Sequence, residues 1–243
     1  MQKATLILFP NLLGKDSDFS DFFPDLVKKR IKHIDGLYCE SEKEGRRYLL
    51  RFLSKSKANS IPLRILSEHT RDEEFEDLIL PLLEGKTYGI ISDAGLPCLA
   101  DPGHRLVSLA HKYDIFLEAI SGPSSIFLAL ILSGFSGQRF TFHGYLERKE
   151  KELIRQIKTI ENRSENFTQI FIEAPYRNNK LYQFLLKHLR KDTYLCLAQN
   201  LGTYKDMVVT SKIEKFRQKK LKLSKDPMVF LLYRDKKFSN TIV

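Results

Sequence analysis

Short apolar runs alternate with amphipathic stretches along most of the chain. In the first half, apolar runs of strand length stand at 5–9, 34–39, 64–66, 88–92 and 115–120. Between them, apolar residues recur at helical spacing, at positions 48, 49, 52 and 53 and again at 75, 78, 79 and 82. Strands that alternate with helices are typical of a parallel sheet covered by crossover helices. The pattern therefore predicts a five-stranded, mainly parallel α/β unit that ends near residue 120.

A second series of helices and strands begins near position 121. Helices are expected at 124–133, 149–160 and 178–188, and strands at 140–143, 168–172, 194–198, 207–210 and 228–233. The last strands have a basic, helix-like segment between them, which indicates a mixed sheet with hairpin-type pairing near the end. The sequence thus predicts two α/β domains, at 1–120 and 121–235, and a flexible tail at 236–243.

Composition and charge narrow the class of protein. The chain has 243 residues, of which 42% are hydrophobic and 29% charged, enough for one large core or two small ones. No apolar run approaches the roughly 18 to 20 residues of a membrane span, so we expect a soluble, cytoplasmic protein without a secretory leader. The formal net charge of +10 suits a polyanionic partner such as nucleic acid, although many basic chains bind none.

Metal and covalent chemistry have no signal in the sequence. The three cysteines, Cys39, Cys98 and Cys196, lie far apart without a C-x-x-C pair, and the six histidines show no metal-binding spacing. We therefore expect no metal. Dinucleotide-binding, P-loop and nucleophile-elbow motifs are also missing, so the sequence favours a protein that binds and positions its ligands.

Three loops at strand ends could carry chemistry, because ligands of open α/β sheets bind beyond the carboxyl ends of the strands. Loop 92–103 combines two aspartates with glycines and prolines, which suits the presentation of main-chain groups. Asp93, directly after a strand, is the candidate ligand contact, whereas Asp101 and Pro102 fit a helix start as N-cap and N1. The loop at 121–125 either caps the next helix through a serine or binds an anion on its first-turn N–H groups.

The third loop, at 173–178, reads E-A-P-Y-R-N. Its acid and its arginine, Glu173 and Arg177, either orient a ligand or form an ion pair with each other. The residues alone favour the ion pair.

These loops resemble those of the tetrapyrrole methylase superfamily, and most of all its ribosomal-RNA ribose 2′-O-methyltransferase branch. The branch motif S-D-A-G-x-P-x-x-x-D-P-G is complete at 92–103. It is followed in order by G-P-S-S at 122–125, F-H-G-Y-L at 142–146 and E-A-P-Y-R at 173–177. The chain departs from the branch in its first two loops: the glycine of P-I-G-N-L is displaced, and E-S-E-K at 40–43 replaces E-D-T-R.

The resemblance implies two α/β domains with S-adenosylmethionine in the cleft between them, held largely by backbone groups, and a homodimer. The donor contacts that it implies by position are Pro10, Asp93, Leu96, Ser124, Ser125, Ala174, Ala198 and Pro227. Methyl transfer to a ribose hydroxyl needs an aligned nucleophile and a proton acceptor. Glu40 and Glu173 fit the role of acceptor or orienting acid by position, and Arg177 fits a contact to phosphate or to the acid.

Three functions stay open at this point. The first is methylation of a ribose in RNA of the small ribosomal subunit. The second is methylation of a tetrapyrrole or another small molecule, and the third is RNA binding without catalysis. The run at 212–225, with seven Lys or Arg and one Glu, could contact RNA phosphates, and a solvated loop is the alternative.

Overall fold

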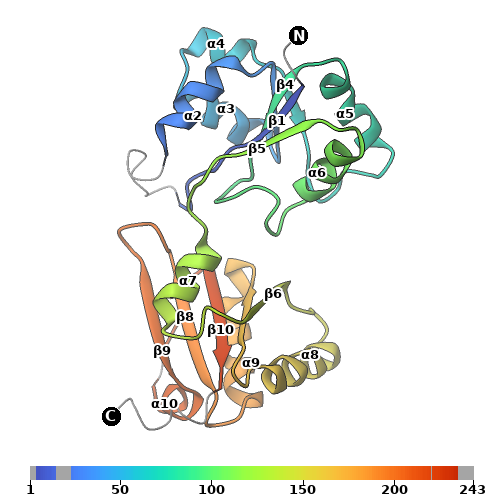
Figure 1. Cartoon of the computed structure of the whole chain (residues 1–243). Coiled ribbons are helices and arrows are strands. Elements are labelled where there is room, and N and C mark those ends of the chain that lie inside the picture. The colour runs from blue at the N-terminus through green and yellow to red at the C-terminus, as the bar shows by residue number, and fades with distance from the viewer. Residues whose placement is uncertain (1–3, 15–22, 220, 235–243) are drawn as a thin grey trace. The chain divides into compact units, whose positions relative to one another are not determined.

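The computed structural model describes residues 4–14, 23–219 and 221–234. The chain divides into two compact units, Met1–Ser124 and Ser125–Val243, and each is built on its own five-stranded sheet (Figure 1). The expected tail at 236–243 lies outside the described residues. No helix in the described ranges is long and apolar enough to cross a membrane.

The first unit contains a parallel sheet, here sheet A. Its strands are β1 (Thr5–Leu8), β2 (Gly36–Cys39), β3 (Leu63–Ile65), β4 (Thr87–Ile90) and β5 (Phe116–Ala119), in the spatial order β3-β2-β4-β1-β5. Every strand pair in it is parallel. The five-stranded parallel unit is therefore confirmed, and the carboxyl ends of all five strands lie at one edge of the sheet.

Helices cover both faces of sheet A. Successive side chains of a strand point to opposite faces, so each strand contributes apolar side chains to two cores. One face packs against α2 (Asp25–Arg30), η1 (Ile31–His33), α3 (Glu42–Leu50) and α4 (Lys55–Ser60). The other packs against α5 (Glu74–Leu83) and α6 (Gly103–Lys112). Along β1, for example, Ile7 belongs to the first core and Leu6 to the second. Both strand faces are buried, which explains why β1, β2 and β4 read as continuous apolar runs.

The second unit contains a mixed sheet, here sheet B. Its strands are β6 (Phe140–Tyr145), β7 (Thr168–Ile172), β8 (Tyr194–Gln199), β9 (Met207–Lys212) and β10 (Met228–Tyr233), in the order β6-β7-β10-β8-β9. Among the pairs of strands that the structure describes in this sheet, β6 and β7 are parallel and the other three are antiparallel. The mixed sheet is confirmed. The hairpin-type pair is β8 with β9, whereas β10 enters the middle of the sheet between β7 and β8.

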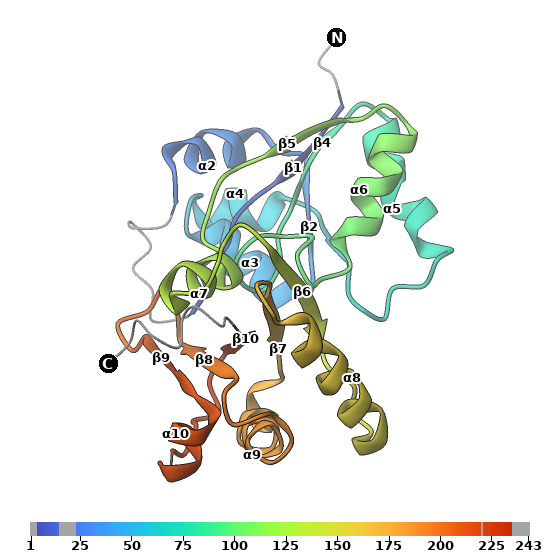
Figure 2. The ribbon, with the colours of Figure 1, turned by 60° about the horizontal axis from the view of Figure 1, so that its bottom comes forward.

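The helices of the second unit also form two layers around their sheet (Figure 2). On one face, α8 (Glu150–Arg163), α9 (Asn178–His188) and α10 (Ile213–Gln218) bury apolar side chains such as Ile157, Leu185 and Phe216. On the other face, α7 (Ser125–Ser133) buries Ile126 and Leu130 against the sheet. A short 3-10 helix, η2 (Pro175–Arg177), leads from β7 into α9.

Candidate functional site

The loop after β1 is hydrogen-bonded to the loop after β4 at the carboxyl edge of sheet A. The Asn11 amide N–H donates to the Gly95 carbonyl at 2.7 Å, and the Gly95 N–H donates to the Leu12 carbonyl at 3.3 Å. The Asn11 side chain adds a second connection, because its Nδ2 donates to the carbonyl oxygens of Ser92 (2.9 Å) and Asp93 (3.2 Å). The two loops therefore form one connected surface.

Asn11 is buried and is itself held from α3. Its Oδ1 accepts hydrogen bonds from the Leu12 N–H at 2.9 Å and from Arg51 Nη1 at 2.8 Å. The Tyr48 hydroxyl, also on α3, donates to the Pro10 carbonyl at 3.0 Å. Sequence reasoning did not select Asn11, and the only signal that could have found it is the position of an amide side chain in a loop directly after a strand. The structure gives it the central position between the first two loops.

The loop after β5 packs closely against the same surface. A Cβ atom on Gly122 would lie 2.1 Å from the Cβ of Pro10, and one on Gly95 would lie 3.4 Å from the Pro123 carbonyl oxygen. Gly95 also has a φ of +73°, in the left-handed region that favours glycine. Glycine at these two positions lets the loops after β1, β4 and β5 approach one another directly.

Ser124 ends this loop and Ser125 is the first residue of α7. The Ser124 Oγ is buried and has no hydrogen-bond partner among the described residues. Capping of α7 by this hydroxyl is therefore not what the structure shows. A buried hydroxyl without a partner is costly, and a polar ligand at this point would satisfy it.

Glu40 connects the loop after β2 to the loop after β4. Its Oε1 accepts a hydrogen bond from the Asp93 N–H at 2.9 Å. Burial raises the pKa of Glu40, the Asp93 N–H opposes this shift, and the negative charges of Asp93 and Asp101 add to the increase. Burial also raises the pKa of Asp93, with a further contribution from Glu44. The edge therefore holds carboxyl groups that are more basic than free ones.

Asp101 has a structural role in the loop after β4. Its Oδ1 accepts from the Gly103 N–H at 2.7 Å and its Oδ2 from the Cys98 N–H at 2.8 Å. The helix α6 begins at Gly103, one residue later than expected, so Pro102 occupies the cap position while the carboxylate still satisfies the first helical N–H. Between these bonds, Cys98 and Ala100 adopt φ values of +67° and +68°, an uncommon conformation for residues other than glycine. The Asp101 carboxylate stabilises this turn, and the half-buried Leu96 lies within the same loop.

In the second unit, Glu173 and Arg177 form an ion pair. Arg177 Nη2 lies 3.1 Å from Glu173 Oε2, and the Glu173 side chain is 2% exposed. The other carboxylate oxygen accepts from the Ala174 N–H at 2.8 Å. The pairing favoured by the residues alone is confirmed. A catalytic role for either side chain stays a prediction.

The remaining predicted contacts lie at one end of the three inner strands of sheet B. Ala174 follows β7, Ala198 is near the end of β8, and Pro227 precedes β10. Val229 of β10 pairs with Ile172 of β7 on one side and with Ala198 on the other. Three positions far apart in the sequence are thus brought to one end of neighbouring strands, and their contact with a donor stays a prediction.

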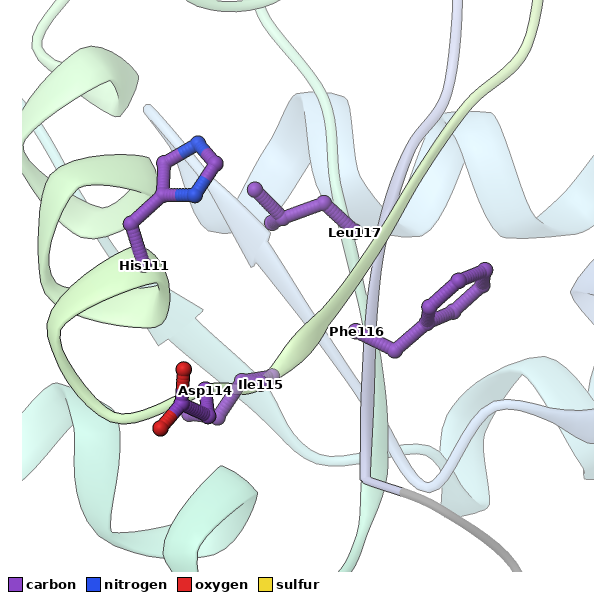
Figure 3. Close-up of a pocket in the computed structure, with 5 residues that line it drawn as sticks. All are labelled: His111, Asp114, Ile115, Phe116 and Leu117. Atoms are coloured by element: carbon purple, nitrogen blue, oxygen red, sulfur yellow. The ribbon is translucent and has the colours of Figure 1, made fainter.

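In the described parts of the chain, no group of three or more His, Cys, Asp or Glu side chains could hold a metal ion. A surface hollow is lined by His111, Asp114, Ile115, Phe116 and Leu117 (Figure 3). It lies where β5 begins, at the opposite end of that strand from the loops described above. The hollow contains none of the predicted site residues.

Comparison with known proteins gives several relatives of similar sequence. A ribosomal RNA small subunit methyltransferase I from Streptococcus pyogenes is 34% identical over 72% of this chain, and one from Thermotoga maritima is 30% identical over 61% of it. A third, from Bacillus subtilis, is 28% identical over 86% of this chain. These matches span 57% to 64% of the length of those relatives.

The fold has a solved counterpart, and a family model covers most of the chain. The crystal structure of the methyltransferase CobJ superposes with a TM-score of 0.60 over 95% of this chain and 93% of that one, at 11% sequence identity. The likeness shows that the two folds agree. The model named Tetrapyrrole (Corrin/Porphyrin) Methylases matches residues 2–217. The chain therefore belongs to the tetrapyrrole methylase family.

Proposed function

We propose that this chain is an S-adenosylmethionine-dependent methyltransferase that modifies the 2′-hydroxyl of a ribose in ribosomal RNA. The observation that carries the proposal is the connected edge of sheet A, where the loops after β1, β2, β4 and β5 meet through Asn11, Glu40 and two glycines. The names of the relatives in Streptococcus, Thermotoga and Bacillus support RNA of the small ribosomal subunit as the substrate.

The residues of this edge fit the proposed methyl donor. When bound, S-adenosylmethionine supplies an electrophilic methyl group on a positively charged sulfonium. The basic carboxyl groups of Glu40 and Asp93 place negative charge at the edge, which favours a cationic ligand. The buried Ser124 hydroxyl has no hydrogen-bond partner in the part of the chain that the structure describes, and it is available to a polar group of the donor. We assign donor binding in this unit to Pro10, Asp93, Leu96 and Ser124, and we add Ser125, the first residue of the second unit.

Glu40 is the residue that we propose as proton acceptor. A ribose hydroxyl becomes a stronger nucleophile as its proton is transferred to a base, and a raised carboxyl pKa strengthens that base. The Asp93 N–H holds only one of the two carboxylate oxygens of Glu40. Glu173, in contrast, is buried in its ion pair with Arg177. This difference favours Glu40, with Glu173 and Arg177 acting in substrate positioning.

The proposal includes four further points. The second unit contributes three donor contacts, Ala174, Ala198 and Pro227. The protein acts in the cytoplasm, it forms a homodimer, and it needs no metal. Sedimentation of the purified chain tests the dimer, and a monomer at micromolar concentration contradicts it. Activity in the presence of a chelator tests the absence of a metal.

One experiment tests the activity. The chain is titrated calorimetrically with S-adenosylmethionine and then incubated with radiolabelled donor and small ribosomal subunits or their extracted RNA. We expect donor binding, and label that is sensitive to ribonuclease, resistant to protease and located at a 2′-O-methyl ribose. Glu40→Gln is expected to bind the donor while it loses at least about 100-fold in turnover, the typical contribution of a general base.

The other outcomes identify the alternatives. Donor binding followed by transfer to a tetrapyrrole but not to RNA would assign the chain to small-molecule methylation. RNA binding without donor binding would identify a protein that has lost catalysis. Either result overturns the proposal.

A further inference from the structure

Positive charge is concentrated in the second unit. Residues 125–243 contain 23 Lys and Arg against 11 Asp and Glu, a formal net charge of +12. Residues 1–124 contain 17 against 19, a net charge of −2. Nucleic-acid phosphates are attracted by such an excess, which supplies affinity without base recognition. The second unit therefore has the charge that an RNA-binding surface requires.

Six exposed lysines lie on α9, on α10 and on the segment between α10 and β10. They are Lys180, Lys187, Lys215, Lys219, Lys222 and Lys225, which we call the lysine face. None of the six forms an ion pair with a residue in the part of the chain that the structure describes. Their charges are therefore available to an external anion.

Contacts between α9 and α10 place the two helices beside each other on one face of sheet B. The two helices lie side by side (Figures 1 and 2). From α10, Arg217 Nε donates to the Leu186 carbonyl at 2.8 Å and its Nη2 to the Leu189 carbonyl at 2.7 Å. These bonds satisfy carbonyls at the carboxyl end of α9. On α9 itself, Lys180 and Lys187 are seven residues apart, which places them about 10 Å apart on the same side of the helix.

Residues 221–227 are held against the start of α9. The Asn179 side chain accepts from the Leu223 N–H at 2.8 Å and donates to the Leu223 carbonyl. Asn178 Nδ2 donates to the Asp226 carbonyl at 2.7 Å. Lys222 and Lys225 lie next to these anchored residues. Asparagine side chains thus anchor this stretch, and in the described ranges the head groups of Lys222 and Lys225 form no hydrogen bond.

We propose that the lysine face binds the backbone phosphates of the RNA substrate and thereby sets the affinity for RNA. This inference rests on the proposed function. Unpaired like charges repel one another in the free chain, and phosphate groups relieve the repulsion. Phosphates are shared by every RNA sequence, so the lysine face contributes affinity without base specificity.

The test removes three charges from the lysine face and three from a matched surface. The test variant is K215Q/K219Q/K222Q. The control is K29Q/K32Q/K57Q, which neutralises three exposed lysines of the first unit. Equilibrium binding to small-subunit RNA is measured without donor at several salt concentrations. We expect the slope of log K against log salt to fall by about 2 in the test variant, since each lost contact to single-stranded RNA removes about 0.7.

The kinetic readout separates substrate binding from chemistry. The test variant is expected to raise KM for RNA at least tenfold, and to leave kcat and the calorimetric Kd for S-adenosylmethionine unchanged. The control variant is expected to match the wild-type chain in all of these measurements. Circular dichroism and thermal unfolding check that both variants fold.

Several results would overturn the inference. One is an unchanged salt slope in the test variant, and another is an equal loss in the control. Unchanged binding to extracted RNA with reduced transfer to assembled subunits would assign the lysine face to a ribosomal protein. Because RNA binding is measured without donor, the absence of methyl transfer would refute the proposed function and leave the binding result standing.

Discussion

Asn11 is the residue whose replacement should loosen the connected loops at the edge of sheet A. Asn11→Ala removes the hydrogen bonds to the Ser92 and Asp93 carbonyls and the acceptor used by the Leu12 N–H and Arg51. A hydrogen bond between neutral groups contributes about 1 kcal/mol to the free energy of unfolding, and a hydrogen bond to a charged group about 1.5 to 3 kcal/mol. The long bond to the Asp93 carbonyl, at 3.2 Å, contributes less than either. Since such contributions do not add fully, we expect the free energy of unfolding to fall by about 3 kcal/mol.

The loss should also reach the proposed donor site. With only the two backbone hydrogen bonds left between the loop after β1 and the loop after β4, the binding-competent arrangement becomes less populated, and the apparent Kd rises in inverse proportion to its population. We expect at least a tenfold increase in the calorimetric Kd for S-adenosylmethionine, which corresponds to about 1.4 kcal/mol. Urea unfolding measures the stability of the same samples.

Arg46 provides the matched control in the same unit. Its Nη1 donates to the Ala58 carbonyl at 2.6 Å and the Ile61 carbonyl at 2.7 Å, and it takes no part in the connected loops. Arg46→Met should therefore destabilise the unit by a similar amount, about 3 kcal/mol, with the donor affinity retained. The reasoning is refuted if Asn11→Ala keeps the wild-type donor Kd, or if Arg46→Met weakens it equally.

Two further predictions concern the same edge. Gly122→Ala would place a Cβ atom 2.1 Å from the Pro10 Cβ, so overpacking should cost about 2 kcal/mol and weaken donor binding. The control Gly137→Ala, whose Cβ meets no atom within 4 Å, should change neither stability nor donor binding. Thermal unfolding and calorimetry measure the two properties, and equal effects of the two substitutions would contradict the packing argument. The raised pKa of Glu40 means that the folded chain binds this proton more tightly than the unfolded chain. The contribution of Glu40 to stability is therefore fully present below the pKa that this carboxyl has in the unfolded chain. It is lost as the pH rises through the raised pKa of the folded chain. Glu40→Gln lacks this loss, so its free energy of unfolding should decline less than that of the wild-type chain between pH 4 and 7. Parallel urea-unfolding curves for the two proteins would contradict the assignment.

The strands of both units could be predicted because burial leaves a clear apolar pattern. The strand β7 and the helix α9 have the expected bounds, since the pattern of apolar and polar positions changes abruptly after each of them. The helices α2 and α4 were not predicted. Each is six residues long and buries one side chain, Val27 or Ala58, so no apolar period can develop. Tertiary packing, and not local pattern, stabilises these two helices.

The chemistry-bearing loops could be selected from the sequence, but not their connections. Glu40 and Asp93 were chosen because they follow a strand, and Pro10 because the family resemblance implies it by position. The bond between Glu40 and the Asp93 N–H depends on the register of β2 against β4, in which Tyr38 lies opposite Ile90. Neither the strand order nor this register is encoded in a local pattern. Asn11 was missed for the same reason, because three of its partners, Arg51, Ser92 and Asp93, lie 40 to 82 residues away.

The central position of β10 imposes an order on biosynthesis. Sheet A is complete once residue 119 has been made, so the first unit can begin to fold while translation continues. Sheet B lacks its middle strand until Met228–Tyr233 has been synthesised, and β7 and β8 have no partner for their facing edges before then. A ribosome that stalls a few codons early would release a chain with a finished first half and two open strand edges, a substrate for chaperones and proteases.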